Sequence, residues 1–404
     1  PGPIGGVETR AWMLARGLAQ TGWSVDFVVR HTAPLRQRTY QGVRLRGVID
    51  RLYRIRESVS TRVERRPGFP FLKFHSFSPS LLWQLPLLAV CRPFRRKPPE
   101  CWVEGSDFTA SPPDVFLTFG VHADSSPVVA SAHVVDRPAV VSIAHDSDLD
   151  ERYVEGSNFV SNYGDRGHDC WRVLQEADAI FCQTEWQRDV LKSRFQRDAT
   201  IVNNPIDVEQ WDAGLSRAAS GIWPHELDGC ERYLLWVGRS ERVHKRPQLF
   251  IDLMRELPDA KGLMILNGRD DAFESELRRA VPDNVRIVSD VPFPAMPSVF
   301  SRAAALINTA SMEGFANVFL QAALSRVPIV SLQVGRPFLE ASGAGVDCEG
   351  DWSRFVRSAR ETWSQPFNPG EFSRAREYVI ERHTLPRVID RVRELLSDFV
   401  TQRP

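Results

Sequence analysis

The sequence predicts an α/β protein with two parallel β-sheets, each covered by helices on both faces. Short apolar segments rich in aliphatic and β-branched residues recur along the chain, and amphipathic segments of helical period separate most of them. Such alternation is typical of parallel strands joined by crossover helices. The length of 404 residues and the 43% hydrophobic content are enough for two domains with sizeable cores.

The first domain is predicted to span residues 1–205. A glycine-rich start leads into a helix, and strands are expected at 25–29, 43–48, 114–119, 139–144, 179–182 and 200–202. A glycine loop that opens a helix normally follows a strand, which delivers the loop to the crevice above the sheet. Because no strand precedes Pro1 here, we expect that the natural first strand is missing from this chain.

The second domain is predicted to span residues 230–385. Strands are expected at 233–237, 263–266, 285–288, 305–307 and 329–331, and helices at 247–257, 273–281, 318–325, 352–363 and 373–382. Residues 206–229 contain several turn-forming residues and are expected to form the linker. A separate C-terminal helix, 386–404, could cross back to the first domain.

The charge of the chain is balanced overall but uneven along its length. The formal net charge is zero, yet residues 44–97 carry 13 Lys or Arg and 3 Asp or Glu, a local charge of +10. Aromatic residues lie among these cations, a mixture that could meet an anionic membrane surface or a lipid-linked or phosphorylated acceptor. The alternative is a core helix at 80–90 with a solvated basic flank. Nucleic acid is less favoured, because no recognised binding module accompanies the charge.

Cysteine usage and hydropathy indicate the cellular compartment. Six scattered cysteines form no CxxC pair or other metal-ligand spacing, so we expect reduced thiols and no metal. No secretory signal opens the chain, and the longest uncharged run, 76–91, is too short and too polar to span a membrane. We therefore expect a cytoplasmic protein, peripheral at the inner membrane face if the basic region binds lipid.

The most informative segment is 311–323, which directly follows the predicted strand at 305–307. Glu313 precedes Gly314, a short turn follows, and an apolar helix carrying Gln321 then begins. A carboxylate accepts hydrogen bonds from hydroxyls, and the first amides of a helix bind anions, so this segment suits a ligand with hydroxyls and phosphates. The alternative is an ordinary acid at a helix start followed by a surface amide.

Three other segments carry candidate binding residues. Gly5-Gly6 lets a ligand approach the backbone before a helix, although an ordinary flexible loop shows the same pattern. Gly238-Arg239 ends a predicted strand, and Arg239 and Lys245 could either converge on a phosphate or be solvated surface cations. His145 follows an apolar strand, where open α/β sheets place ligand groups, although a lone histidine can also be structural.

Taken together and in this order, these segments resemble the family-4-type retaining glycosyltransferases, also described as glycosyl transferases group 1. That family has the GT-B fold, in which two Rossmann-like domains face a central cleft. The resemblance covers essentially the whole chain and is weakest between residues 50 and 113. The motifs that carry it are Gly5-Gly6-Val7-Glu8, His145-Asp146, Asn204-Pro205-Ile206-Asp207, Val237-Gly238-Arg239 with Lys245, and Glu313-Gly314-Phe315-Ala316-Asn317-Val318.

The resemblance implies a role for each motif. The Gly5-Gly6 loop would lie near the donor phosphates, and His145 would contact the donor sugar, commonly at its 6-hydroxyl. Gly238 would lie in the donor site, and Arg239 and Lys245 would bind the diphosphate. Glu313 would bind sugar hydroxyls. Sugar and phosphate would be held by the amides of Gly314, Phe315, Ala316, Asn317 and Val318.

One position departs from the family. The second acidic residue of the family pair, which grips the nucleotide ribose, falls at Gln321 in this sequence. A carboxylate accepts two hydrogen bonds from ribose hydroxyls, whereas an amide accepts one and donates one, so ribose binding remains possible without charge assistance. This substitution bears on donor affinity more than on chemistry.

The implied reaction transfers a sugar from a nucleotide-diphosphate donor to a hydroxyl, with retention at the anomeric carbon and without a metal. The catalytic candidates are Glu313, Lys245, Arg239 and His145, and no cofactor is expected besides the donor substrate. The departing phosphate itself takes the acceptor proton, and a glycan, a lipid-linked molecule or a small molecule would accept the sugar. The rival interpretations are a GT-B epimerase or phosphorylase and a non-catalytic subunit whose donor site has decayed at Gln321.

Overall fold

The structure is a computed structural model that divides into two compact units. It describes residues 5–31, 38–49, 52–60, 62–65, 71–74, 76–91, 112–122, 124–161, 164–221, 227, 229, 231–267, 271–289, 291–365, 370 and 372–401. The N-terminal unit comprises residues 10–202 and 389–404, and the C-terminal unit comprises residues 1–9 and 203–388. Helices α1 (Gly6–Gln20) and α17 (Leu385–Thr401) each contribute residues to both units. The units are described separately below.

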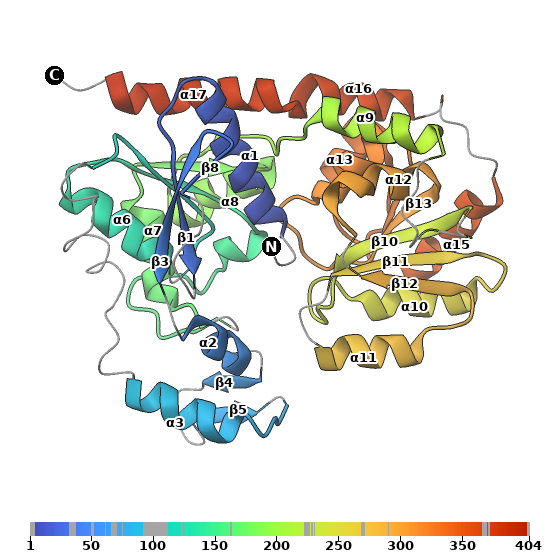
Figure 1. Cartoon of the computed structure of the whole chain (residues 1–404), viewed down its shortest axis with the longest axis horizontal. Coiled ribbons are helices and arrows are strands. Elements are labelled where there is room, and N and C mark those ends of the chain that lie inside the picture. Colours follow the sequence, from blue (N-terminus) through green and yellow to red (C-terminus); the bar gives the residue numbers. More distant parts are fainter. Residues whose placement is uncertain are drawn as a thin grey trace. The chain divides into compact units, whose positions relative to one another are not determined.

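The C-terminal unit contains a six-stranded parallel sheet with the order β12-β11-β10-β13-β14-β15 (Figure 1). Its strands are β10 (Tyr233–Arg239), β11 (Gly262–Asn267), β12 (Val285–Ser289), β13 (Ala303–Asn308), β14 (Ile329–Ser331) and β15 (Gly345–Asp347). The five strands expected from the sequence are confirmed. The sequence analysis missed β15, which has only three residues and begins with glycine.

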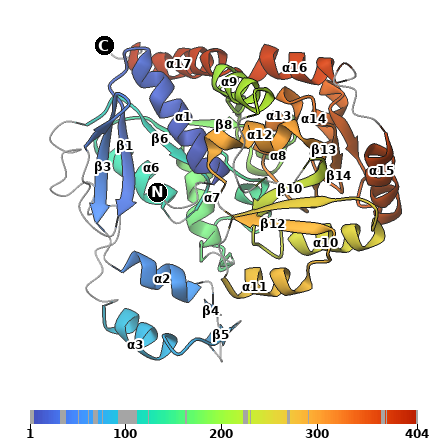
Figure 2. The same ribbon diagram turned by 45° about the vertical axis from the view of Figure 1, so that its right-hand side comes forward.

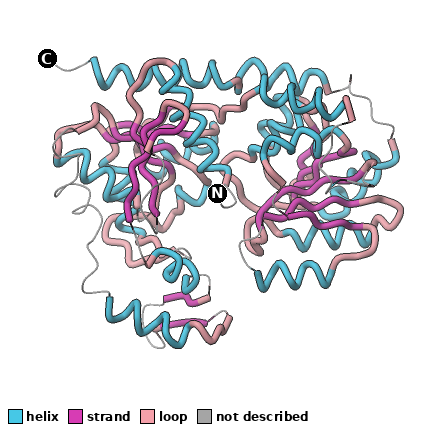
Figure 3. The backbone as a smooth tube through the Cα atoms, viewed as in Figure 1, coloured by secondary structure: helices cyan, strands magenta, loops and turns pink. Residues whose placement is uncertain are grey.

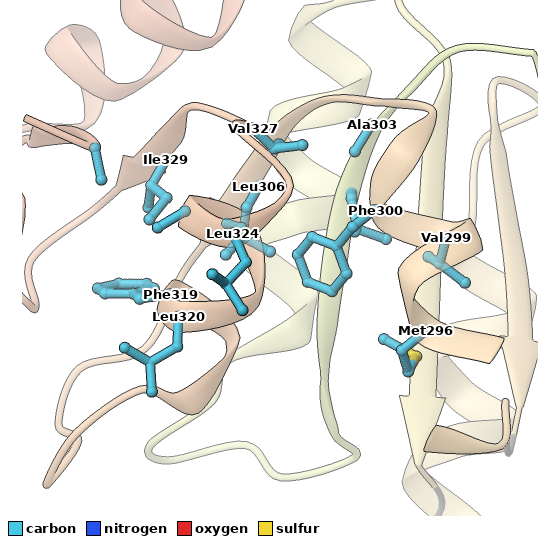
Figure 4. Close-up of a cluster of buried hydrophobic side chains, with 14 of the residues drawn as sticks. Met296, Val299, Phe300, Ala303, Leu306, Phe319, Leu320, Leu324, Val327 and Ile329 are labelled. Carbon is cyan, nitrogen blue, oxygen red and sulfur yellow. The ribbon is translucent and has the colours of Figure 1, made fainter. Parts of the chain in front are cut away.

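Side chains of this sheet alternate between two buried faces, as the pleat of a strand requires. On one face Trp236, Leu266 and Ile307 pack with α10 (Pro247–Glu256), α11 (Asp271–Ala280) and α15 (Trp352–Ser364). On the other face the core includes Leu235 and Leu306 with helices α9 (Val208–Ala219), α12 (Met296–Ser301), α13 (Asn317–Leu324), α14 (Arg336–Ser342) and α16 (Ser373–His383). Figure 3 shows helices on both sides of these strands, and Figure 4 shows part of the second core.

The predicted linker at 206–229 is wrong in its first half, which is a folded part of the C-terminal unit. Residues Val208–Ala219 form α9, capped by Asp207, whose carboxylate accepts the Gln210 amide hydrogen bond at 3.1 Å. Trp211 is buried, and its Nε1 donates to Ser325 Oγ at 3.0 Å. At Gly214 an added Cβ would lie 2.5 Å from a carbon of Pro297, so this glycine permits close packing of α9 on α12.

The described strands of the N-terminal unit form three sheets. A parallel sheet with the order β6-β7-β8-β9 contains β6 (Phe116–Phe119), β7 (Ala139–Ser142), β8 (Ala179–Cys182) and β9 (Thr200–Ile201). A second sheet pairs β1 (Asp26–His31) parallel to β3 (Val43–Ile49), with the short β2 (Thr39–Tyr40) antiparallel to β3. A short antiparallel pair, β4 (Val63–Arg65) and β5 (Leu72–Phe74), was not expected from the sequence.

Helices α6 (Ser125–Val134), α7 (Gly167–Glu176) and α8 (Glu185–Phe195) supply the core that packs on the four-stranded sheet. Parallel strands with helical crossovers in both units confirm the predicted α/β fold class. Among the described residues, no helix is long and apolar enough to cross a membrane.

Candidate active site

The candidate site of the C-terminal unit lies in the loops that follow three adjacent strands, β10, β13 and β14. Because the strands are parallel, their carboxyl ends meet at one edge of the sheet, the place where open α/β sheets bind ligands. The loops are 240–246 after β10, 309–316 after β13 and 332–335 after β14.

The loop after β10 is organised by Glu241, a residue that the sequence analysis did not single out. Its carboxylate accepts hydrogen bonds from the amides of Val243, His244 and Lys245 at 2.8, 2.7 and 3.0 Å. Three charge-assisted bonds to consecutive amides fix the backbone of this loop. Glu241 therefore determines where the backbone of Lys245 lies.

Thr309 joins this loop to the loop after β13. Its hydroxyl accepts from the Nε1 of buried Trp236 at 2.9 Å and lies 2.8 Å and 3.0 Å from the carbonyl oxygens of Lys245 and Arg246. The Arg246 guanidinium donates to Thr309 O at 2.7 Å and to Gln333 Oε1, in the loop after β14, at 2.9 Å. All three loops are thus held in a single hydrogen-bonded network.

This network brings Lys245 and Glu313 together in an ion pair. The side chain of Glu313 is only 11% exposed and that of Lys245 is 32% exposed, so the carboxylate is the more enclosed partner. The two residues are 68 positions apart in the sequence, and each was predicted independently as a ligand-binding group. A cation and a carboxylate on one sheet edge can bind a phosphate and sugar hydroxyls side by side.

A short turn, 314–316, separates Glu313 from helix α13, which begins at Asn317. No hydrogen bond within the described part of the chain uses the amides of residues 314–318. The Phe315 ring packs 5.6 Å from the Phe338 ring and stacks 5.4 Å from that of His383, which anchors the turn. Burial lowers the pKa of His383 to about 4, so this ring is neutral near neutral pH.

The side chain of Asn317 makes hydrogen bonds within the protein. Its Oδ1 accepts from Asn204 Nδ2 at 2.7 Å, and its Nδ2 donates to Gly6 O at 3.4 Å. The Gly5-Gly6 turn also lies beside Arg239, since a Cβ added at Gly5 would collide with that guanidinium. The Arg239 guanidinium lies 3.7 Å from the Glu8 carboxylate, and the side chain of Arg239 is 34% exposed. The structure therefore brings the glycine turn, Arg239 and the start of α13 together.

Gln321 lies in the second turn of α13 and is 8% exposed. Its Oε1 is buried and has no hydrogen-bond partner among the described residues. Buried amide oxygens are nearly always satisfied, so this atom is an exception that a bound ligand would explain. The alternative of a surface amide at this position is wrong.

His145 belongs to the N-terminal unit, where it follows β7 and caps the short 3₁₀ helix η2 (Asp146–Leu149). Its Nδ1 accepts a hydrogen bond from the Ser147 amide at 3.1 Å, so the neutral ring carries its proton on Nε2. The Asp148 carboxylate accepts from the amides of Ala144 and His145 at 2.8 and 3.1 Å. Burial raises the pKa of Asp148. The ring is thus oriented as a hydrogen-bond donor through Nε2.

Arg10 also fixes this region, and sequence reasoning missed it. The residue is 3% exposed, and its Nη1 and Nη2 each donate at 3.1 Å, to Ile143 O beyond β7 and to Val202 O beyond β9. Gln183 Nε2 donates to the same Ile143 O at 2.9 Å. Burial lowers the pKa of Arg10 to about 10, so the guanidinium remains charged at neutral pH. An arginine inside a helix is ordinary in a sequence, so the sequence pattern did not indicate this role for Arg10.

The structure thus places Lys245, Glu313, Arg239, Gln321 and the glycine turn in the C-terminal unit and His145 in the N-terminal unit. Gly238 is the penultimate residue of β10, before Arg239, and a Cβ added there would lie 2.6 Å from the Trp236 ring. No group of three or more histidine, cysteine or acidic side chains suited to a metal ion occurs in the described residues.

Comparisons with known proteins identify the family. A sequence profile described as Glycosyltransferase Family 4 matches residues 4–210, and one described as Glycosyl transferases group 1 matches residues 231–364. No curated protein matches the chain at the sequence level. The two profiles together cover the segments that carry the candidate site residues.

Solved structures share the fold at low sequence identity. Sucrose-phosphate synthase from Thermosynechococcus elongatus is 15% identical with a TM-score of 0.67, covering 99% of this chain and 95% of its own. The Anabaena protein HepE, solved in complex with UDP, is 13% identical with a TM-score of 0.61 and 98% of both chains covered. WaaG, a glycosyltransferase involved in lipopolysaccharide biosynthesis, is 13% identical with a TM-score of 0.61, covering 99% and 97%.

These likenesses establish the GT-B architecture, with its two Rossmann-like domains. The family profiles favour sugar transfer over the epimerase, the phosphorylase and the non-catalytic subunit considered above. Because the first profile spans more than half of the 404 residues, the chain belongs to Glycosyltransferase Family 4 and is a glycosyltransferase.

Proposed function

We propose that this protein transfers a sugar from a nucleoside-diphosphate donor to a hydroxyl acceptor, with retention of the anomeric configuration and without a metal cofactor. The Lys245–Glu313 ion pair beside the unused amides of 314–318 is the observation that carries the proposal. Diphosphate and sugar hydroxyls are the two ligand chemistries that this pair and these amides match.

In the proposed reaction the bond between the anomeric carbon and the β-phosphate oxygen breaks, and the acceptor oxygen bonds to the same face of that carbon. The acceptor proton passes to the departing phosphate, so no protein base is required. Lys245, Arg239 and the α13 amides stabilise the charge that develops on this phosphate. Glu313 holds sugar hydroxyls, and His145 donates to the sugar through Nε2. The positive charge that the transition state places on the sugar resembles that of other glycosyl transfers.

The acceptor is proposed to be a hydroxyl of a glycan or of a lipid-linked molecule used in building cell-surface glycans. The cationic and aromatic composition of residues 44–97 supports this class of acceptor. The UDP in the structure of the Anabaena relative supports a uridine donor as the first to test.

A donor panel tests the proposal. Calorimetry with UDP-, GDP- and ADP-sugars is expected to identify one donor that binds, and NMR of the product is expected to show the anomeric configuration of that donor. Activity should persist in EDTA after the protein has been freed of metal. An inverted product, or activity that EDTA abolishes and added divalent metal restores, would contradict the retaining, metal-free mechanism.

The Gln321 position makes a separate prediction about donor affinity. Gln321→Glu restores the carboxylate of the family and is expected to tighten donor binding about fivefold, because charge assistance contributes about 1 kcal/mol to such a hydrogen bond. The Kd values of the wild type and of Gln321→Glu, measured by calorimetry, check this prediction. The kcat is expected to change less than the Kd. A carboxylate that weakens donor binding would contradict this prediction.

A further inference from the structure

The described residues between Tyr53 and Cys91 in the N-terminal unit form a small module that contains none of the candidate donor-site residues. It contains α2 (Tyr53–Ser60), β4, β5 and α3 (Leu81–Cys91), which lie together in Figure 2. Its hydrophobic core is small. Val59, Val63 and Leu81 are buried, and the partly buried Leu85 and Leu88 pack against them. This cluster leaves most of the apolar surface of the module uncovered.

The exposed surface of the module is strongly apolar. Seven of the eighteen large hydrophobic side chains that are exposed among the described residues lie between residues 71 and 90. The most exposed are Phe77, Leu82 and Val90, at 69, 70 and 66%, and the others are Phe71, Leu72, Phe74 and Trp83. Exposed apolar residues concentrated in this way mark an interaction surface rather than the usual scatter. The alternative of a core helix at 80–90 is wrong, because α3 buries only Leu81 and Gln84.

The charges around this surface are mostly positive, although the module also contains Glu57 and Glu64, and Glu64 lies opposite Lys73 in the β4–β5 pair. No Asp or Glu occurs between Glu64 and Glu100, whereas seven Lys or Arg residues do. Lys73 is exposed on β5 between Phe71 and Phe74, and four of the seven cations follow α3 directly in the sequence, at 92, 95, 96 and 97. Arg44 and Arg46 do not belong to this surface, because both pair with Asp26. The remaining cations of the basic region lie within the module or beside it in the sequence.

We propose that the 53–91 module docks on the surface of an anionic lipid bilayer. Aromatic and aliphatic side chains insert at the boundary between headgroups and acyl chains, and Lys and Arg bind anionic headgroups. Helix α3 has 11 residues and carries no charged side chain, but its length of about 16 Å, at 1.5 Å per residue, is well short of a bilayer core of about 30 Å. It therefore lies in the interface and does not span the membrane.

Vesicle flotation of the full chain tests this inference without donor or acceptor, so its outcome is independent of the proposed reaction. The protein is expected to float with vesicles of phosphatidylcholine containing 30% phosphatidylglycerol at least tenfold more than with phosphatidylcholine alone. Binding should weaken as NaCl rises from about 0.1 to 0.5 M, because the Debye length shortens from about 10 Å to below 5 Å.

Matched variants locate the surface. Phe77→Ser combined with Trp83→Ser is expected to lower binding at least tenfold, and Lys73→Glu severalfold. Trp186→Ser removes an aromatic side chain that is 48% exposed on α8 of the same unit, and it should bind vesicles as the wild type does. All these side chains are exposed, so thermal unfolding should change little.

Three results would overturn the inference: no flotation of the wild type, flotation equal on both vesicles, or flotation unchanged in the double serine variant. Size-exclusion chromatography distinguishes a second copy as the occupant. A wild-type dimer that the double serine variant converts to a monomer, with no vesicle binding, would assign the surface to self-association and not to lipid.

Discussion

Replacing Lys245 or Glu313 with alanine is expected to lower donor turnover, as kcat/KM, by about 10²–10³-fold, the loss typical of removing one group that stabilises developing charge. Lys245 is the proposed contact of the departing phosphate, so its loss should appear mainly in kcat. Glu313 holds the sugar in ground and transition states alike, so its loss should raise KM as well.

The ion pair complicates each single variant. Lys245→Ala leaves the Glu313 carboxylate, 11% exposed, without its counter-charge, and such a group destabilises the fold as well as the site. Thermal unfolding must therefore be measured beside the kinetics. The double alanine variant is expected to be more stable than the worse single variant but no more active, since both groups serve one transition state.

Arg242→Ala provides the matched control. Arg242 is a cation on the same loop, is 55% exposed and pairs with Glu276 on α11. Its removal is expected to leave kcat/KM within about twofold, because exposed ion pairs contribute little. Wild-type rates for both Lys245→Ala and Glu313→Ala would show that the site has been assigned to the wrong residues.

Alternation of apolar and amphipathic segments was sufficient to predict the fold, because buried parallel strands need continuous apolar runs. It failed where the role of a residue depends on tertiary packing and not on the local sequence. Gly214 indicates a linker in the sequence, but in the fold it allows α9 to approach Pro297 closely. The α3 segment is apolar enough for a core helix, yet the module that contains it has almost nothing to bury it against.

The candidate site was predictable at the residues proposed to bind ligand directly and hidden at the residues that act through another residue. Lys245 and Glu313 could be predicted because cations and acids at strand ends are unusual. Glu241 and Thr309, which position them, are ordinary polar residues in ordinary loops. Their roles depend on hydrogen bonds to Lys245 and across to Trp236, which only the folded arrangement defines.

Arg10→Met is expected to lower both stability and activity through such an indirect role. Methionine matches much of the volume of arginine but provides no donor, so Val202 O loses its Arg10 bond and Ile143 O keeps only Gln183. Two hydrogen bonds from a charged group contribute about 3–6 kcal/mol before desolvation is counted. No carboxylate is among the groups that affect the pKa of Arg10, so the buried charge has a desolvation cost that no counter-charge offsets. Methionine removes this cost, which offsets part of the lost hydrogen-bond energy. The free energy of unfolding is therefore expected to fall by about 2 kcal/mol.

The loss of activity should exceed what stability explains, because Ile143 lies two residues before His145. A displaced imidazole is expected to raise the donor KM about tenfold, the effect of one misplaced hydrogen bond to a substrate of about 1.4 kcal/mol. Gln183→Leu removes the other donor to Ile143 O and should reproduce a smaller part of the change. Urea unfolding and steady-state kinetics at a temperature where every variant is folded separate the two effects. If Arg10 acts through His145, adding His145→Ala to Arg10→Met should cost little beyond His145→Ala alone, whereas fully additive losses would make Arg10 purely structural.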